Sequence, residues 1–243
     1  MAPLAVIRSG YARISRYPKV PEIIAHKIVQ EISRRGLRVG HQLPSESVMM
    51  GRFSVGRSTL RESLRLLEVN GLLSIRTGPG GGPVVATADP AHLGRMATLY
   101  FQMAGATYRE LYDAWLTGEG LLAEWAARNP DAALRREVLG PYIRGEETSA
   151  EDPREYPQFH NEIASLASNR VLAMTLQAIA HISAHHVAST QDYIAHRDHN
   201  VDEEHQEIGR AIAHGSPRRA RELMESHMRS ALADPPDQVI SWL

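Results

Sequence analysis

The sequence predicts a mainly α-helical protein in which the only strands form a small hairpin within the first 90 residues. Helical periodicity of apolar residues recurs along most of the 243-residue chain. A glycine-rich stretch between two short apolar runs, LLSIRTGPGGGPVVAT, interrupts it near residue 80. Charge divides the chain as well, because residues 1–86 hold 13 Lys and Arg against 5 Asp and Glu, whereas the remainder holds 14 against 23. We therefore expect two domains, of which the basic one meets a polyanion.

Composition excludes several classes of protein. With 43% hydrophobic and 23% charged residues, the chain is typical of a soluble globular protein. It has no run of about 18 apolar residues, so we expect no membrane span. The basic N-terminal stretch lacks the apolar core of a secretion signal. The absence of cysteine excludes disulfides and cysteine-ligated metals, and favours a cytoplasmic location.

The first helices follow a short basic segment. Residues 1–18 have little periodicity, and we interpret them as a flexible basic arm. Residues 21–36 place Ile23, Ile24, Ile28 and Ile32 on one predicted helix face before a stop at Gly36. A turn-rich link, LRVGHQLPSES, comes next, and Ser45 is positioned to cap a second short helix that ends near residue 53.

A third helix is predicted from residue 57 to about 70. Arg57 and Arg61 fall four residues apart on one side, with Ser58 and Thr59 beside them. The leucines of this helix and Val69 are expected on another side, and Gly71 stops it. The two apolar runs on either side of GPGGG at 78–82 form a hairpin. A nucleotide-binding loop is excluded, because no lysine follows these glycines and a strand flanks them on each side.

Three helices followed by a hairpin are the layout of a winged helix-turn-helix, which we assign to residues 19–87. An isolated basic helix is more often a solvated face, but here the neighbouring elements and the charge agree with DNA binding. The start of a recognition helix meets base edges in the major groove. We expect DNA contacts from the third helix and, at the base of the wing, from Arg76 and Thr77. Those of the helix are Arg57, Ser58, Thr59 and Arg61, with Arg65 further back.

The rest of the chain predicts an all-helical bundle at residues 88–233, followed by an irregular tail at 234–243. Gly, Pro or Asn punctuates most junctions between the predicted helices. The helices are expected near 90–104, 107–128, 131–140, 154–167, 170–191, 197–214 and 216–231.

Specific segments resemble a known family. LPSES and FSVGRSTLRESLRLLEVNGLLSIRTGPGG are similar to the GntR family's L-P-S-E-R turn, V-S-R-x-x-V-R-E-A-L helix and strand ending in R-x-G. FHNEIASLASN and EEHQEIGRAIAHGSPRRARELMESH resemble the FadR-type effector domain, called FCD. The resemblance implies a ligand-responsive regulator of the FadR subfamily that binds a palindromic operator as a homodimer. A repressor is expected, and an activator stays open.

The resemblance also implies roles for individual residues. Arg57, Ser58, Thr59 and Arg61 would contact operator DNA, with Thr77 and Gly78 at the wing. Ser47 stands where the family has an arginine that contributes to DNA contact, so sequence preference or affinity is expected to differ.

In the effector domain, His160, His205 and His227 match three metal-binding histidines of the family and imply one divalent ion such as Zn²⁺. Tyr156 replaces an aspartate ligand, and Trp115 replaces the arginine of an R-x-x-x-E motif whose Glu119 is kept. Two interpretations stay open, a metal site or a cavity that has lost it. We expect Trp115, Glu119, Tyr156 and His160 to line the effector pocket, unless Trp115 and Tyr156 are simply core residues.

The loss of charge at these positions favours an apolar effector such as a fatty acyl or acyl-CoA molecule. The alternative is a small carboxylate held with the help of a metal. A helical metalloenzyme with Glu204 as base is disfavoured, because H-E-x-x-H and G-x-S-x-G are both missing, and we expect no enzyme. A structural DNA-associated protein without an effector is disfavoured by the size of the second domain.

Overall fold

The computed structural model describes residues 18–78, 80–146, 158–189, 201–231 and 236–241. These residues form two compact units, which divide between His92 and Leu93 and are treated separately below. Most of the predicted N-terminal arm lies outside the described residues.

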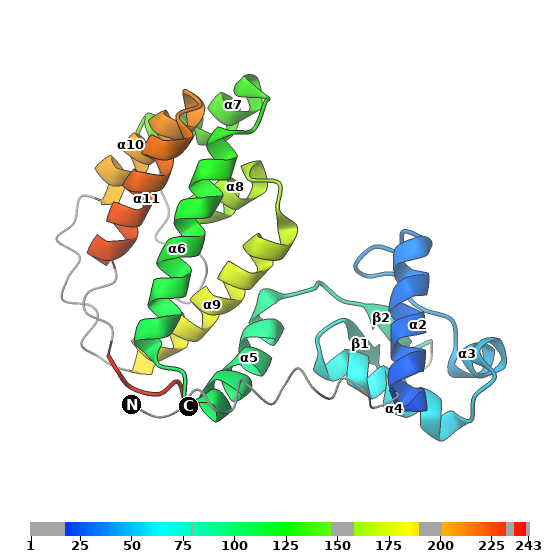
Figure 1. The fold of residues 1–243 in the computed structure, drawn as a ribbon. Coiled ribbons are helices and arrows are strands. Elements are labelled where there is room, and N and C mark those ends of the chain that lie inside the picture. Colours follow the sequence, from blue (N-terminus) through cyan, green and yellow to red (C-terminus); the bar gives the residue numbers. More distant parts are fainter. Residues whose placement is uncertain (1–17, 79, 147–157, 190–200, 232–235, 242–243) are drawn as a thin grey trace. The chain divides into compact units, whose positions relative to one another are not determined.

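The first unit has the predicted order of elements (Figure 1). Its helices are α2 (Val20–Arg34), α3 (Glu46–Phe53) and α4 (Arg57–Val69). The hairpin pairs β1 (Leu73–Arg76) antiparallel with β2 (Gly82–Val85), and Leu73 lies opposite Val85. A winged helix-turn-helix is therefore confirmed.

Apolar side chains from all three helices and the hairpin form one core in this unit. Gly71 closes α4 with a positive φ of 69°, and an added Cβ there would lie 2.1 Å from the ring of His92. Only glycine fits both the backbone conformation and the contact. The core residues are Ile24, Ala25, Ile28, Leu43, Met49, Leu60, Leu64, Leu67, Leu73 and Val85.

Three local predictions in this unit were wrong. Ile23 and Val69 are 37% and 64% exposed, although we expected both on apolar faces. Val69 follows Leu60 by nine residues, which at 100° per residue places it on the opposite side of α4. Ser45 occupies the N-cap position of α3, but its side chain makes no capping hydrogen bond. Its Oγ lies 3.0 Å from Oγ of Ser47 instead.

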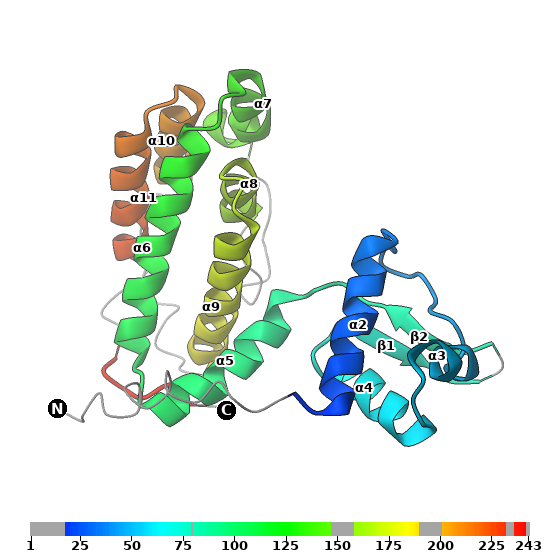
Figure 2. The same cartoon turned by 45° about the vertical axis from the view of Figure 1, so that its right-hand side comes forward.

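Within the described residues, the regular elements of the second unit are helices (Figure 2). The long helix α6 is central and packs against α8, α9, α10 and α11, and α7 packs against α8 and α10. The helices are α5 (Pro90–Ala104), α6 (Tyr108–Ala127), α7 (Ala132–Ile143), α8 (Gln158–Leu166), α9 (Arg170–Ser189), α10 (Val201–Ala213) and α11 (Pro217–Ala231).

Local signals explain where these helices begin. Thr107 caps α6 in a capping box, in which its hydroxyl accepts from the Glu110 N–H while the Glu110 carboxylate accepts from the Thr107 N–H. The Asp131 carboxylate caps α7 by accepting from two backbone N–H groups. We expected α7 to end at Gly140, but it continues through Pro141 to Ile143. Packing of Tyr142 edge-on against Phe159 stabilises this last turn despite the proline.

The described part of the tail, residues 236–241, has no helix, as expected. It is nevertheless docked, because the Tyr108 N–H donates to the Gln238 carbonyl and the Ile240 N–H donates to the Ala106 carbonyl. Ile240 is buried in the core of the helical unit. Among the described helices, none is both long and apolar enough to cross a bilayer.

Candidate nucleic-acid interface and metal centre

The basic face of α4 is exposed. Arg57, Ser58, Arg61 and Arg65 are all exposed, and helical spacing places them within an arc of roughly 100°. Leu60, Leu64 and Leu67 of α4 point the other way and are buried in the core. Thr59 is half-buried at the edge of the exposed face. This part of α4 is therefore free to lie against a partner.

The start of α4 adds a second feature that suits an anion. Gly56 is the N-cap, and no side chain caps the first N–H groups of this helix. Those groups and the helix dipole attract negative charge. Arg57, the first residue of the helix, adds a guanidinium at the same end. A phosphate of the DNA backbone would be favoured at this position.

Arg61 is held by the neighbouring helix. Its Nε donates to the Glu46 carboxylate of α3, at 3.3 Å to Oε1 and 3.1 Å to Oε2. Both partners are exposed, so the pair contributes little to stability. The pair instead positions the Arg61 side chain. Its Nε is bonded to Glu46, and the two terminal nitrogens of the guanidinium stay available to bond a base edge.

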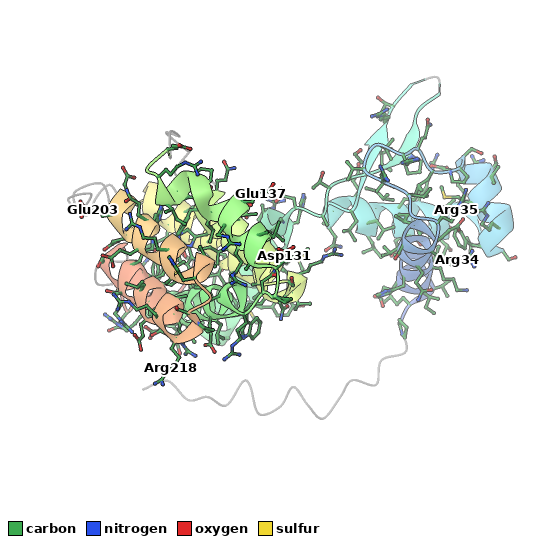
Figure 3. All side chains as sticks on the ribbon, turned by 90° about the horizontal axis from the view of Figure 1, so that it is seen from above. Arg34, Arg35, Asp131, Glu137, Glu203 and Arg218 are labelled. Atoms are coloured by element: carbon green, nitrogen blue, oxygen red, sulfur yellow. The ribbon has the colours of Figure 1, made fainter. Side chains whose placement is uncertain are left out.

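The wing residues predicted to contact DNA are exposed to solvent. Arg76 ends β1, and Thr77 and Gly78 follow it, all exposed. Gln42, which the sequence did not single out, anchors the tip of the hairpin by donating from Nε2 to the carbonyls of Gly80 and Gly81, at 2.8 and 3.0 Å. Arg34 and Arg35, labelled in Figure 3, lie at the end of α2.

The histidine cluster lies inside the second unit, where folding joins three separate helices. His160 comes from α8, His205 from α10 and His227 from α11. Their side chains are buried, with 4%, 5% and 5% of their surface exposed. One ligand nitrogen from each lies within 4.8 Å of the others. The structure therefore unites the three histidines that the sequence placed up to 67 residues apart.

Two carboxylates orient two of these rings. Glu119 of α6, fully buried, has Oε2 at 2.9 Å from Nδ1 of His160. Glu204 of α10 has Oε2 at 2.7 Å from Nδ1 of His227. In the neutral tautomer that suits an accepting carboxylate, Nδ1 carries the proton and Nε2 keeps a lone pair. This carboxylate–histidine pairing is typical of rings that bind a metal.

The residues present fit a divalent ion of the zinc type. Three buried imidazoles are a common protein ligand set for Zn²⁺, and a fourth position is left for an oxygen ligand. Two nitrogens on one tetrahedral zinc lie roughly 3.3 Å apart, so nitrogens that now lie within 4.8 Å of one another would need to draw together by at most about 1.5 Å. Phe159 stacks on His205 with ring centroids 3.9 Å apart and restricts that ring.

Glu204 does not occupy the position of a general base. Its carboxylate is bonded to Nδ1 of His227, on the side of the ring away from Nε2. In this geometry it orients the ring rather than facing an oxygen on the far side of it. The arrangement gives no support to the metalloenzyme interpretation.

The predicted effector residues are only partly brought together. Trp115, Glu119 and His160 form one chain of contacts, because the Trp115 indole Nε1 donates to Oε1 of Glu119 at 3.1 Å. Tyr156 lies outside the described residues. Trp115 also packs against the core, as the core interpretation expects, and its place in an effector pocket stays a prediction.

Comparison with known proteins bears on both units. The family model described as "Bacterial regulatory proteins, gntR family" matches residues 22–81, and the FCD domain model matches residues 110–230. The first unit is therefore similar to the DNA-binding part of GntR-family regulators, and the second unit is similar to FCD domains.

Relatives and one solved structure are similar to this chain over most of its length. The transcriptional repressor NanR of Edwardsiella tarda is 28% identical over 224 residues, covering 88% of this chain and 85% of that protein. NanR of Salmonella arizonae is 27% identical over 240 residues, covering 96% and 90%. A GntR structure from Streptococcus agalactiae matches with a TM-score of 0.60 and 24% identity over 86% of this chain and 98% of that one, which supports the fold.

Ser47 is the departure from the GntR pattern that the structure locates. It is exposed on α3, in the helix that also presents Glu46 to Arg61. A serine there has neither the reach nor the charge of an arginine. Sequence reasoning identified this position, but it missed Gln42 and Phe159, whose contacts join residues far apart in the chain.

Proposed function

We propose that this protein is a ligand-responsive transcriptional repressor of the FadR subfamily. It binds a palindromic operator as a homodimer in the cytoplasm, where the bacterial chromosome lies. The observation that carries the proposal is the exposed, uncapped start of α4, with Arg57, Ser58 and Arg61 on one face beside a wing. The repressor role is taken from the NanR relatives.

The DNA-binding proposal predicts the effect of two substitutions. Arg57→Ala and Arg61→Ala should each weaken specific binding by about 5- to 150-fold, because each removes a guanidinium worth about 1–3 kcal/mol at a base edge or phosphate. A suitable probe is a DNA sequence selected from a random pool by the unmodified full-length protein. Affinity is measured by mobility shift at fixed salt concentration.

Arg218→Ala on α11 is the matched control, because it removes an equally exposed arginine from the acidic unit (Figure 3). It should leave the affinity unchanged. If the two α4 variants bind the selected DNA as tightly as this control, α4 is not the recognition helix. Failure of the unmodified protein to select any sequence would reject the DNA-binding function itself.

For the effector domain, we propose that His160, His205 and His227 hold one divalent metal, and that the effector is a small carboxylate bound with its help. The gathering of three buried histidines, two of them oriented by carboxylates, supports this alternative over a cavity that has lost its metal. The ion would supply an electrophilic position for an oxygen of the effector. Effector binding would then act by favouring one of two dimer arrangements.

Metal binding predicts a stoichiometry and a stability change. The full-length protein should carry about one zinc ion per chain by elemental analysis, and removal by a chelator should lower its Tm by roughly 5–10 °C. His205→Gln should abolish the metal content, whereas His214→Ala, just after the end of α10, should not, since His214 is exposed and its Nδ1 lies 2.6 Å from the Arg210 carbonyl. Equal metal content in both variants would reject the site.

The fatty acyl effector stays a prediction from the sequence. Trp115 contributes a hydrogen bond as well as apolar surface, because its indole N–H donates to Glu119. Thermal shifts separate the two classes of effector. Stabilisation by small carboxylates that requires the metal supports the carboxylate, and metal-independent stabilisation by an acyl-CoA supports the acyl ligand.

A further inference from the structure

The tip of the wing contains glycines whose backbone other residues do not tolerate. Gly78, Gly80 and Gly82 have positive φ angles of 92°, 76° and 137°. Gly81 lies against the first strand, and an added Cβ there would lie 2.3 Å from the carbonyl oxygen of Arg76. Because glycine loses more backbone freedom on ordering than any other residue, this segment is costly to hold in one conformation.

The hairpin itself fixes the tip only weakly. The last pair of residues in its ladder is Arg76 opposite Gly82. Beyond this pair, the Gly81 N–H donates to the Gly78 carbonyl at 2.9 Å and closes the turn. That hydrogen bond joins two residues of the tip to each other and does not tie the tip to the rest of the unit. A contact from outside the hairpin is needed for that.

The link between α2 and α3 provides the base for such a contact. It runs along β2, where the Val85 N–H donates to the His41 carbonyl at 2.9 Å and the Leu43 N–H donates to the Pro83 carbonyl at 2.8 Å. Leu43 is also buried in the core of this unit. The backbone on both sides of Gln42 is therefore tied to the hairpin and to the core.

The side chain of Gln42 extends from this base to the tip. Its Nε2 donates to the carbonyls of Gly80 and Gly81, which follow it by 38 and 39 residues in the chain, at 2.8 and 3.0 Å. Both hydrogens of the amide group are thus used on the tip. Because the backbone of Gln42 is already fixed, this contact restricts only the freedom of its own side chain.

We propose that Gln42 is the positioning residue of the wing. It holds the tip in one conformation, so that Arg76, Thr77 and Gly78 meet DNA already ordered. The proposal rests on the DNA-binding function proposed above and adds a residue on which the wing's contribution depends. A wing that is ordered before contact binds more tightly than one that is ordered during binding, because ordering lowers the affinity.

Gln42→Met tests the contact in the full-length protein, because methionine is nearly as long as glutamine but has no donor. Its affinity for the selected DNA should fall about 3- to 10-fold, as expected for the loss of a hydrogen bond of ordinary strength. Gln30→Met is the matched control, since Gln30 is exposed on α2 of the same unit, and it should leave the affinity unchanged. Mobility shift at fixed salt concentration measures both.

Tryptic cleavage provides a readout that does not involve DNA. Cleavage of the bond after Arg76 requires local opening of the hairpin, so its rate follows the population of the open form. In the free protein, Gln42→Met should raise the initial rate of this cleavage about 3- to 10-fold, and Gln30→Met should not change it. Mass spectrometry identifies the fragments, and circular dichroism should give both variants the Tm of the unmodified protein.

Double substitutions show whether Gln42 acts through the wing. Gln42→Met combined with Arg76→Ala should weaken DNA binding by less than the product of the two separate effects, because both act on the same contact. Combined with Arg57→Ala on α4, Gln42→Met should give the full product. A residue that only stabilised the unit would lower the Tm and would give the full product with both arginine variants.

The outcomes distinguish this inference from the proposed function. If the unmodified protein selects DNA, and Gln42→Met binds it as tightly as Gln30→Met, the inference fails alone. Unchanged cleavage after Arg76, or a full product of effects with Arg76→Ala, would overturn it as well, because Gln42 would then not act through the wing. Failure of the unmodified protein to select any sequence rejects the repressor and the role of Gln42 in DNA binding together.

Discussion

At the scale of single residues, a side chain that differs from the family pattern can still donate a hydrogen bond to the same neighbour. Trp115 stands where the resemblance implied an arginine, yet it still donates an N–H to Glu119. Glu119 in turn reaches His160, so a neutral donor now supports the carboxylate that orients a candidate metal ligand. The sequence indicated a loss of charge here, and the structure shows that the hydrogen bond is kept.

His186 gives the helical unit a pH dependence. Its ring stacks on Tyr108 with centroids 3.7 Å apart, and burial lowers its pKa below the ordinary 6.5. The unfolded chain therefore binds this proton more readily than the folded chain, so stability falls as the pH drops below about 6.5.

His186→Phe should reduce this acid sensitivity, because phenylalanine keeps the stacked ring and takes no proton. Thermal unfolding at pH 7.5 and pH 5.5 measures the effect, and the fall in Tm between the two should be smaller for this variant than for the unmodified protein. His214→Phe, on an exposed position, should keep the full fall. An equal fall in both variants would show that His186 does not contribute.

At the scale of elements, close approach of helices sets which positions tolerate a side chain. Gly118 of α6 faces Leu176 of α9, and an added Cβ would lie 2.4 Å from Cδ2 and 3.1 Å from Cγ of that leucine. Leu176 is 2% exposed and has little room to retreat. The spacing of α6 and α9 therefore depends on this glycine.

Gly118→Ala should lower the free energy of unfolding by about 1–2 kcal/mol, because overpacking outweighs the gain in helix propensity. Gly51→Ala is a control of opposite sign. Gly51 lies within α3 with nothing within 4 Å of an added Cβ, so alanine should stabilise its unit by about 0.5–1 kcal/mol. Denaturant unfolding measures both, and a stabilising Gly118→Ala would contradict the packing described for α6 and α9.

At the scale of the whole molecule, the unit proposed to bind DNA and the unit proposed to bind the effector differ in charge. The basic unit presents guanidinium groups and an uncapped helix start, whereas the larger, acidic unit buries the histidine cluster. Long-range attraction to DNA therefore acts on the part of the chain that carries α4. The homodimer proposed above would place two such units on one operator, with their recognition helices about 34 Å apart.

The sequence by itself determined the helix-rich fold, the hairpin, and the exposed arginines of α4, because these depend on local periodicity and on turn residues. It also named the three histidines, through their family resemblance. Only the tertiary structure decided that His160, His205 and His227 meet, that Glu119 and Glu204 orient two of them, and that Ile23 and Val69 face water. Periodicity specifies which residues share a face of one helix, whereas the packing of helices distant in the chain decides which faces are covered and which side chains converge.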